Sequence, residues 1–210
     1  MKKVIVLALF LGALASCTGD GEVVDSGVMV TRSACPAVAI PVATGDVTLF
    51  NPESSREASA IDVVANITNL RSTCDESGSD IVTNVTFDIH GRRSDASGAR
   101  EVVLPYFAVV IQGGTNVVAK SVTRAGLRFE DGQLRATTTG AASGRVLRAA
   151  ATLPEEVRRQ VTRNRKPGDA DAALDPLADP VVREAVRRAS FEVLVGFQLS
   201  ESQLGYNATR

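Results

Sequence analysis

The feature that most constrains the fold is a period-two alternation of apolar residues, which is clearest near the end of the chain. Phe191, Val193, Val195, Phe197 and Leu199 occupy every second position. Because successive side chains of a strand point to opposite faces, this segment predicts a strand with one buried face. We therefore expect the C-terminal region to be integral to the core.

Residues 61–68 and 83–90 show the same alternation, with apolar residues at 61, 63, 65 and 67 and at 85, 87 and 89. Between these two candidate strands, residues 75–80 (DESGSD) have the composition of a turn. Two shorter candidate strands, 37–42 and 46–50, lie between proline and glycine residues, which is typical of strands at a sheet edge.

The run 102–111 is nearly continuous apolar sequence, but Pro105 interrupts it. Proline has no amide proton, so we place this residue at an edge, a bulge or a switch between sheets. A further strand is predicted over 117–129, and Asp131-Gly132 predicts a hairpin that joins it to a strand over 133–139.

Seven or eight short strands joined by such turns favour a sandwich or barrel over an α/β arrangement. The predicted fold is mainly β and resembles an immunoglobulin-like β-sandwich with a two-helix insertion before the last strand. This resemblance is architectural and implies no function.

The insertion is predicted at about 152–189. Thr152 and Glu155 fit a capping box that begins a first helix, and Asp179 followed by Pro180 predicts the start of a second helix. We expect the insertion to present a basic interaction surface, because both helices are rich in arginine. The alternative is an ordinary solvated face neutralised by neighbouring acids. The candidate residues of this surface are Arg158, Arg159, Arg163, Arg183 and Arg187.

Candidates for catalysis and metal binding are weak in this sequence. His90 is the only histidine and shares a predicted strand face with Asp88, but no nucleophile motif of the G-x-S-x-G kind accompanies it. Asp169, Asp171 and Asp175 have part of the spacing of a calcium loop, without its glycine or its final glutamate. We therefore predict no enzyme activity, no catalytic residues, no metal and no cofactor.

The N-terminus carries Lys2 and Lys3, then an apolar run over 4–14 that is too short to cross a bilayer, which takes roughly 20 residues. The following Leu14-Ala15-Ser16-Cys17 resembles the lipobox of bacterial lipoproteins. This resemblance implies that residues 1–16 are a signal peptide and that Cys17 carries lipid. Several acyl chains give stable anchoring where a single chain is marginal.

The same resemblance implies a place in the cell envelope. In lipoproteins of Gram-negative bacteria, an aspartate after the lipidated cysteine often marks inner-membrane retention, and this chain has Thr18 there. We expect the outer membrane, with the protein facing the periplasm. Residues 17–34 are predicted to be a lipidated tether, and residues 35–210 a single domain with the helical insertion.

Two other cysteines, Cys35 and Cys74, are expected to form a disulfide, because thiols in an oxidising compartment usually pair. Their separation in the sequence does not suit a redox motif or a zinc site.

The net charge of −1 and the absence of tryptophan give no support to nucleic-acid binding. The leading hypothesis is a non-enzymatic binding or assembly module of the envelope that meets a protein partner and touches the membrane through its lipid. The alternatives are a periplasmic ligand carrier or hydrolase with a site between sandwich and helices, and a purely structural envelope protein.

Overall fold

The computed structural model describes residues 33–163, 168–171 and 173–209. Residues 168–171 and 173 belong to a separate unit, and the other described residues form the body. The predicted signal peptide and Cys17 lie outside the described residues. Within the described part of the chain, no helix is long and apolar enough to span a membrane.

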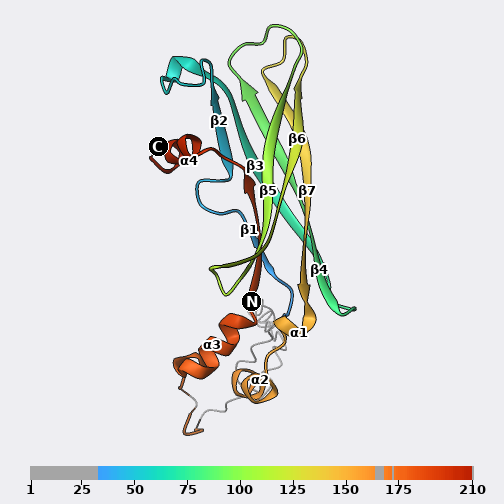
Figure 1. Ribbon diagram of the computed structural model, residues 1–210, viewed down its shortest axis with the longest axis vertical. Helices are drawn as coiled ribbons and strands as arrows, with labels where there is room; N and C mark the ends of the chain where they lie inside the picture. The colour runs from blue at the N-terminus through green and yellow to red at the C-terminus, as the bar shows by residue number, and fades with distance from the viewer. Residues whose placement is uncertain (1–32, 164–167, 172, 210) are drawn as a thin grey trace, which may run out of the picture. The chain divides into compact units, whose positions relative to one another are not determined.

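The body is mainly β and contains two four-stranded sheets (Figure 1). The first sheet has the order β1-β8-β5-β6, in which β1 pairs parallel with β8 and the other pairs are antiparallel. Its strands are β1 (Ala37–Ala39), β8 (Phe191–Phe197), β5 (Arg100–Gln112) and β6 (Asn116–Phe129).

The second sheet has the order β2-β3-β4-β7 and is antiparallel throughout. The turn predicted at 75–80 joins two of its longest strands. Its strands are β2 (Asp46–Phe50), β3 (Ile61–Asp75), β4 (Asp80–Arg93) and β7 (Arg135–Leu147).

One continuous apolar core lies between the sheets, which gives the body its sandwich-like character. The alternation predicted from the sequence is confirmed in β3, β4 and β8. Every second residue is buried over 63–67 in β3, 81–93 in β4 and 191–197 in β8, whereas the residues between them are more exposed in β3 and β4. The remainder of β3, after Ile67, has no buried residue. The largest fully buried side chains are Phe87, Phe129 and Phe197. Burial of such side chains contributes roughly 2–3 kcal/mol each and dominates the stability.

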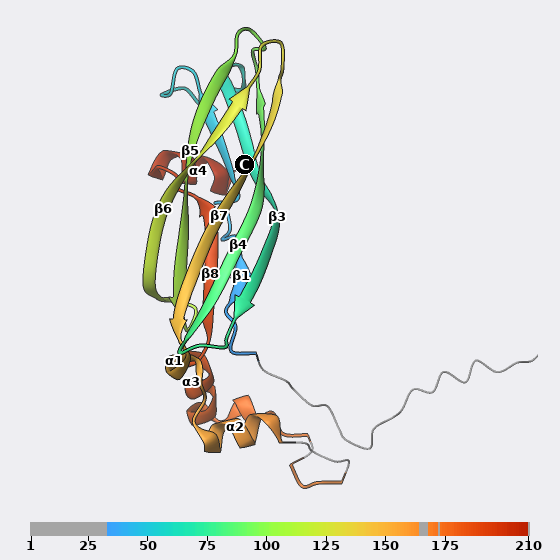
Figure 2. The same cartoon turned by 90° about the vertical axis from the view of Figure 1, so that its right-hand side faces the viewer.

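The predicted hairpin at Asp131-Gly132 is wrong as a strand pairing. Gly132 does form a turn, with φ of 76°, but β6 pairs with β5 while β7 pairs with β4 in the other sheet. The segment therefore carries the chain across the sandwich, as the view in Figure 2 lets the reader follow. A local turn signal cannot reveal this, because the pairing depends on strands distant in the sequence.

Arg93 holds this crossing in place. Only 2% of the residue is exposed, and its guanidinium donates to the carbonyl oxygens of Gln133 (2.8 Å), Glu130 (3.0 Å) and Gly98 (2.8 Å). It also lies 5.4 Å from the centre of the Phe129 ring. These bonds compensate a buried cation and tie the loops before β5 and β7 together.

Four short helices and two 3₁₀ turns are the other elements of the described residues, and one prediction about them needs correction. The N-cap of α2 is Pro154 with no side-chain cap, and Thr152 instead donates to the carbonyl of Arg148 (2.8 Å). Thr152 is the C-cap of α1, and its hydroxyl bonds to that helix, so the predicted capping box at the start of α2 does not form. The elements are η1 (Ala58–Ala60), α1 (Arg148–Ala151), α2 (Glu155–Thr162), η2 (Pro176–Ala178), α3 (Pro180–Arg188) and α4 (Glu201–Thr209).

The predicted cap of α3 is confirmed, because the Asp179 carboxylate accepts from the amide of Val181 (2.8 Å). A reciprocal cap also begins α4. Gln203 accepts from the amide of Ser200 (2.9 Å), and the Ser200 hydroxyl accepts from the amide of Gln203 (3.3 Å).

The predicted disulfide between Cys35 and Cys74 is present, with Cα atoms 6.2 Å apart. It links the segment before β1 to the end of β3. By closing a loop with a sequence separation of 39 residues, it stabilises the fold by roughly 4 kcal/mol on the chain-entropy estimate.

Candidate interaction surface

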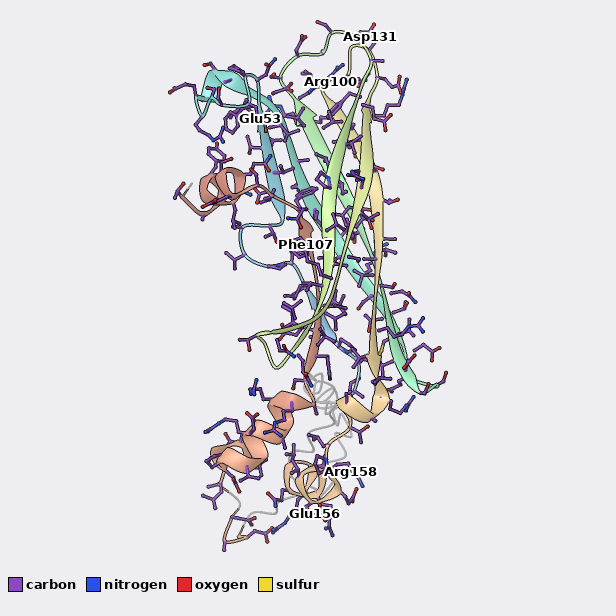
Figure 3. The ribbon with its side chains drawn as sticks, viewed as in Figure 1. Glu53, Arg100, Phe107, Asp131, Glu156 and Arg158 are labelled. Carbon is purple, nitrogen blue, oxygen red and sulfur yellow. A yellow bond between two sulfur atoms is a disulfide. The ribbon has the colours of Figure 1, made fainter. Side chains whose placement is uncertain are left out.

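The arginines predicted to form a basic surface mostly pair with acids of their own helix. In α2, Arg158 makes a bidentate contact with Glu155 at 2.6–2.9 Å, and Arg159 lies 3.9 Å from Glu156. In Figure 3, Arg158 and Glu156 are labelled on this helix. The charge available to a partner is therefore smaller than the number of arginines indicates.

The same holds in α3, where Glu184 receives hydrogen bonds from Arg187 (2.8 Å) and Arg188 (2.9 Å). These bonds lower the pKa of Glu184 to about 2. Arg183 donates to the carbonyl of Leu177 (3.4 Å), and Arg163 is the exposed C-cap of α2. Three of the five predicted arginines therefore pair with acids of their own helix, namely Arg158, Arg159 and Arg187. Arg183 bonds to a backbone carbonyl, and Arg163 ends α2.

His90 and Asp88 share the outer face of β4, as the sequence predicted, but each has a structural partner. The Nδ1 atom of His90 is 3.1 Å from the hydroxyl of Thr137 on β7. Asp88 accepts from the side-chain amide of Asn69 (2.6 Å). Both contacts are exposed; the first joins a cross-strand pair of β4 and β7, and the second reaches the irregular part of β3 between Thr68 and Arg71.

The aspartates considered for calcium fall in two different parts of the described chain. Asp175 caps η2 by accepting from the amide of Leu177 (2.9 Å), whereas Asp169 and Asp171 belong to the separate unit. In the described ranges, no three His, Cys, Asp or Glu residues are placed to hold a metal ion.

Two of the four sheet edges are covered or short. The helix α4 covers β2, where the Asn207 side chain donates to the carbonyls of Ala43 (2.9 Å) and Asp46 (2.7 Å) (Figure 1). The edge β1 has only three residues and follows the disulfide. The edge strand β7 pairs only with β4 among the described strands, and the buried Tyr106 donates to its Ala141 carbonyl (2.8 Å). The cover of β2 and the shortness of β1 limit unwanted strand pairing.

The fourth edge, β6, is long and open. All nine residues from Asn116 to Arg124 are exposed, and among the described strands only β5 pairs with β6. The exposed fractions of Val117, Val118 and Val122 are 58%, 51% and 53%. We name residues 116–124, together with the adjoining Val103 and Phe107 of β5, the β6 surface.

The outer face of the β6 surface combines apolar and cationic side chains. The register pairs Phe107 with Val122 and Pro105 with Arg124, and Lys120 lies 5.3 Å from the centre of the Phe107 ring. Figure 3 labels Phe107 on this sheet. Exposed apolar side chains beside an open strand edge are typical of a protein-binding site.

The sequence analysis predicted this strand but not its exposure. The signal that was available is the run Val117–Arg124, in which charged and hydroxyl residues fall on both alternating faces. A strand with polar groups on both faces has no side that must be buried.

A second feature is a cavity of about 320 Å³ where β2, β3 and β5 approach the start of α4. A bidentate ion pair lies in its wall, in which Arg100 donates to the two Asp62 carboxylate oxygens at 2.8 and 2.6 Å. These hydrogen bonds to Asp62 raise the pKa of Arg100. Arg56 lies over Phe50, 5.1 Å from the ring centre. Figure 3 labels Glu53 and Arg100 in this region. His90 is not among its lining residues.

Comparisons of the chain with models of protein families, with curated proteins and with solved structures return no match.

Proposed function

We propose that this protein is a lipid-anchored module of the bacterial cell envelope that binds a protein partner without catalysing a reaction. The observation that carries the proposal is the open β6 strand, whose nine consecutive exposed residues contrast with the helix-covered β2 and the three-residue β1. An open edge with exposed apolar side chains is available for pairing with a strand of a partner.

The proposed anchor rests on the lipobox resemblance of residues 14–17 and places the protein at the outer membrane, facing the periplasm. A disulfide-stabilised body suits that oxidising compartment. The two facing sheets also support placing the body among immunoglobulin-like sandwiches, an architecture used by many binding modules.

Site-specific photocrosslinking in native cells tests the binding site. A photoreactive residue in place of Val118 on β6 is expected to capture one dominant envelope protein. The matched control replaces Thr137, which is exposed on the outer face of the other sheet. Equal, diffuse capture from both positions would contradict a binding role for β6 and favour a purely structural envelope protein.

The anchor is tested separately with Cys17→Ser, followed by membrane fractionation. The variant is expected to lose acylation and to leave the membrane fraction, because the lipid supplies the membrane affinity. Continued membrane association of an unacylated variant would contradict the anchor while leaving the β6 site intact.

The cavity beside α4 favours a second candidate function, that of a carrier for a small polar ligand. Its lining includes two arginines, two carboxylates and two serines: Arg56, Arg100, Glu53, Asp62, Ser200 and Ser202. A screen of small periplasmic metabolites by thermal shift tests this role. A ligand that stabilises the protein but not an Arg56→Ala variant would support it.

A further inference from the structure

We propose that β6 accepts, as an added antiparallel strand, an extended partner segment in which two acidic residues flank an apolar one at alternate positions. The inference rests on the proposed binding function and specifies the partner's chemistry. It follows from the direction of the β6 backbone groups and from the charges beside them.

The first step concerns the backbone of β5. The carbonyl of Pro105 accepts from the amide of Gln198 on the β8 side (2.9 Å). Pro105 is paired with Arg124 in the register of β5 and β6. Because its carbonyl points towards β8, this pair does not exchange ladder bonds, and the backbone groups of Arg124 point away from β5.

The same geometry repeats along β6 at every second residue. The register is continuous from Arg124 to Ala119, so Val122 and Lys120 also direct their amides and carbonyls towards the open edge. Three successive donor and acceptor pairs are therefore presented to a partner backbone.

The second step concerns the side chains that accompany these groups. Lys120, Val122 and Arg124 share the outer face, since their partners Val109, Phe107 and Pro105 lie at alternate positions of β5. No described carboxylate pairs with Lys120 or Arg124. On the same face, Glu130 accepts from Arg128 at 2.7 Å, and the Glu101 carboxylate lies over Gly126, between Arg124 and Arg128.

These side chains define the spacing required of the partner. A residue opposite Val122 has neighbours on the same face two positions before and after it, which lie opposite Lys120 and Arg124. The matching segment therefore has an acidic residue, any residue, an apolar residue, any residue and a second acidic residue.

The same charges disfavour a second copy of this chain as the occupant. An antiparallel pairing that places Val122 opposite its own copy brings each Lys120 opposite an Arg124. Like charges directly opposite each other destabilise a strand pair, and lysine on an edge strand is a known protection against self-association.

The test uses two fluorescent peptides, TETVTET and TKTVTKT, each acetylated and amidated, with the full-length protein in detergent. Fluorescence anisotropy is expected to show binding of the glutamate peptide about tenfold tighter than that of the lysine peptide, because two ion pairs replace two repulsions. The double variant Lys120→Glu, Arg124→Glu is expected to reverse this preference. Reversal also shows that the variant still folds.

A second pair of variants tests the backbone contact. Val122→Pro removes one outward amide and is expected to weaken binding of the glutamate peptide strongly, whereas Val122→Thr retains the amide and is expected to weaken it much less, through the lost apolar contact alone. Equal binding of the two peptides, or a failure of both to bind, would overturn the inference. The proposed function would survive if the crosslink from position 118 persisted, and would fail with its loss.

Sedimentation velocity tests whether a second copy of this chain binds to the β6 edge instead. The protein is expected to remain monomeric in detergent micelles over the concentrations used. A dimer abolished by Val122→Pro would assign the edge to a second copy and overturn the acidic-partner inference.

Discussion

The edge strands β2 and β6 belong to different sheets and are treated in opposite ways. The helix α4 lies along β2, and its Asn207 and Tyr206 contact that region, with the Tyr206 ring 5.2 Å from the Phe50 ring. β6 has no such cover in the described part of the molecule, although it is the longer strand. Edge protection in this fold is therefore selective.

Protection of the β2 and β1 edges comes from segments that are distant in the sequence. The cover of β2 is supplied by residues about 160 positions later, since Asn207 bonds to Ala43 and Asp46 at separations of 164 and 161. The protection of β1 similarly comes from Cys74. The edge β6 relies on its own side chains, of which Lys120 and Arg124 limit self-pairing.

Of the changes that test this contrast between the edges, removal of the disulfide is expected to lower the free energy of unfolding most. The double variant Cys35→Ala, Cys74→Ala should lose about 4 kcal/mol of unfolding free energy, because the unfolded chain regains loop entropy. Urea denaturation with and without reductant measures the loss. If the variant unfolded at the same urea midpoint as the oxidised protein, the disulfide beside β1 would not contribute to stability.

A proline scan of the first sheet should produce the sharpest contrast. Ala108→Pro is expected to cost about 3 kcal/mol or more, because its backbone groups face β6 within the ladder. Val122→Pro should change the unfolding free energy by only about 0.5 kcal/mol, since its amide faces solvent. Equal losses in thermal unfolding would contradict the assigned backbone directions.

Loss of the α4 cap is expected to be smaller. Asn207→Ala removes two hydrogen bonds to backbone carbonyls near β2 and should cost about 1–2 kcal/mol. The matched control Asn116→Ala lies at the start of the open strand β6 and should be nearly silent. Chemical denaturation of both variants compares the two edges, and equal costs would remove the distinction between them.

The smallest expected effect on stability comes from the charged residues of α3. Glu184, Arg187 and Arg188 of this helix form ion pairs, unlike Lys120 and Arg124 on β6. Hydrogen bonds from Arg187 and then Arg188 hold the pKa of Glu184 at about 2, below its ordinary value of 4.5. The stabilisation is therefore present above pH 4.5 and is lost as the pH falls towards 2. Carboxylate NMR titration should give that midpoint, and Arg187→Gln should raise it; a midpoint near 4.5 would contradict the pairing.

Local patterns in the sequence were sufficient for the strands, the disulfide and the α3 cap. The alternation in 61–68, 83–90 and 191–199 identified the buried faces, because one-sided burial requires period-two spacing. Pro105 was expected at an edge, a bulge or a switch between sheets, and this prediction is wrong, because Pro105 lies in the interior strand β5, paired with Arg124 of β6. The predicted Thr152 cap is wrong because its hydroxyl donates to the carbonyl of Arg148 instead.

By itself, the sequence determined the β character of this protein, the inward faces of β3, β4 and β8 and the pairing of Cys35 with Cys74. Only the tertiary structure decided that Asp131-Gly132 crosses between sheets, that Arg93 is buried and that β6 remains open. The physical reason is that alternation specifies which side chains are buried but not which strands are neighbours. Neighbour choice depends on long-range hydrogen bonds and packing, and that choice decides which edge is left for a partner.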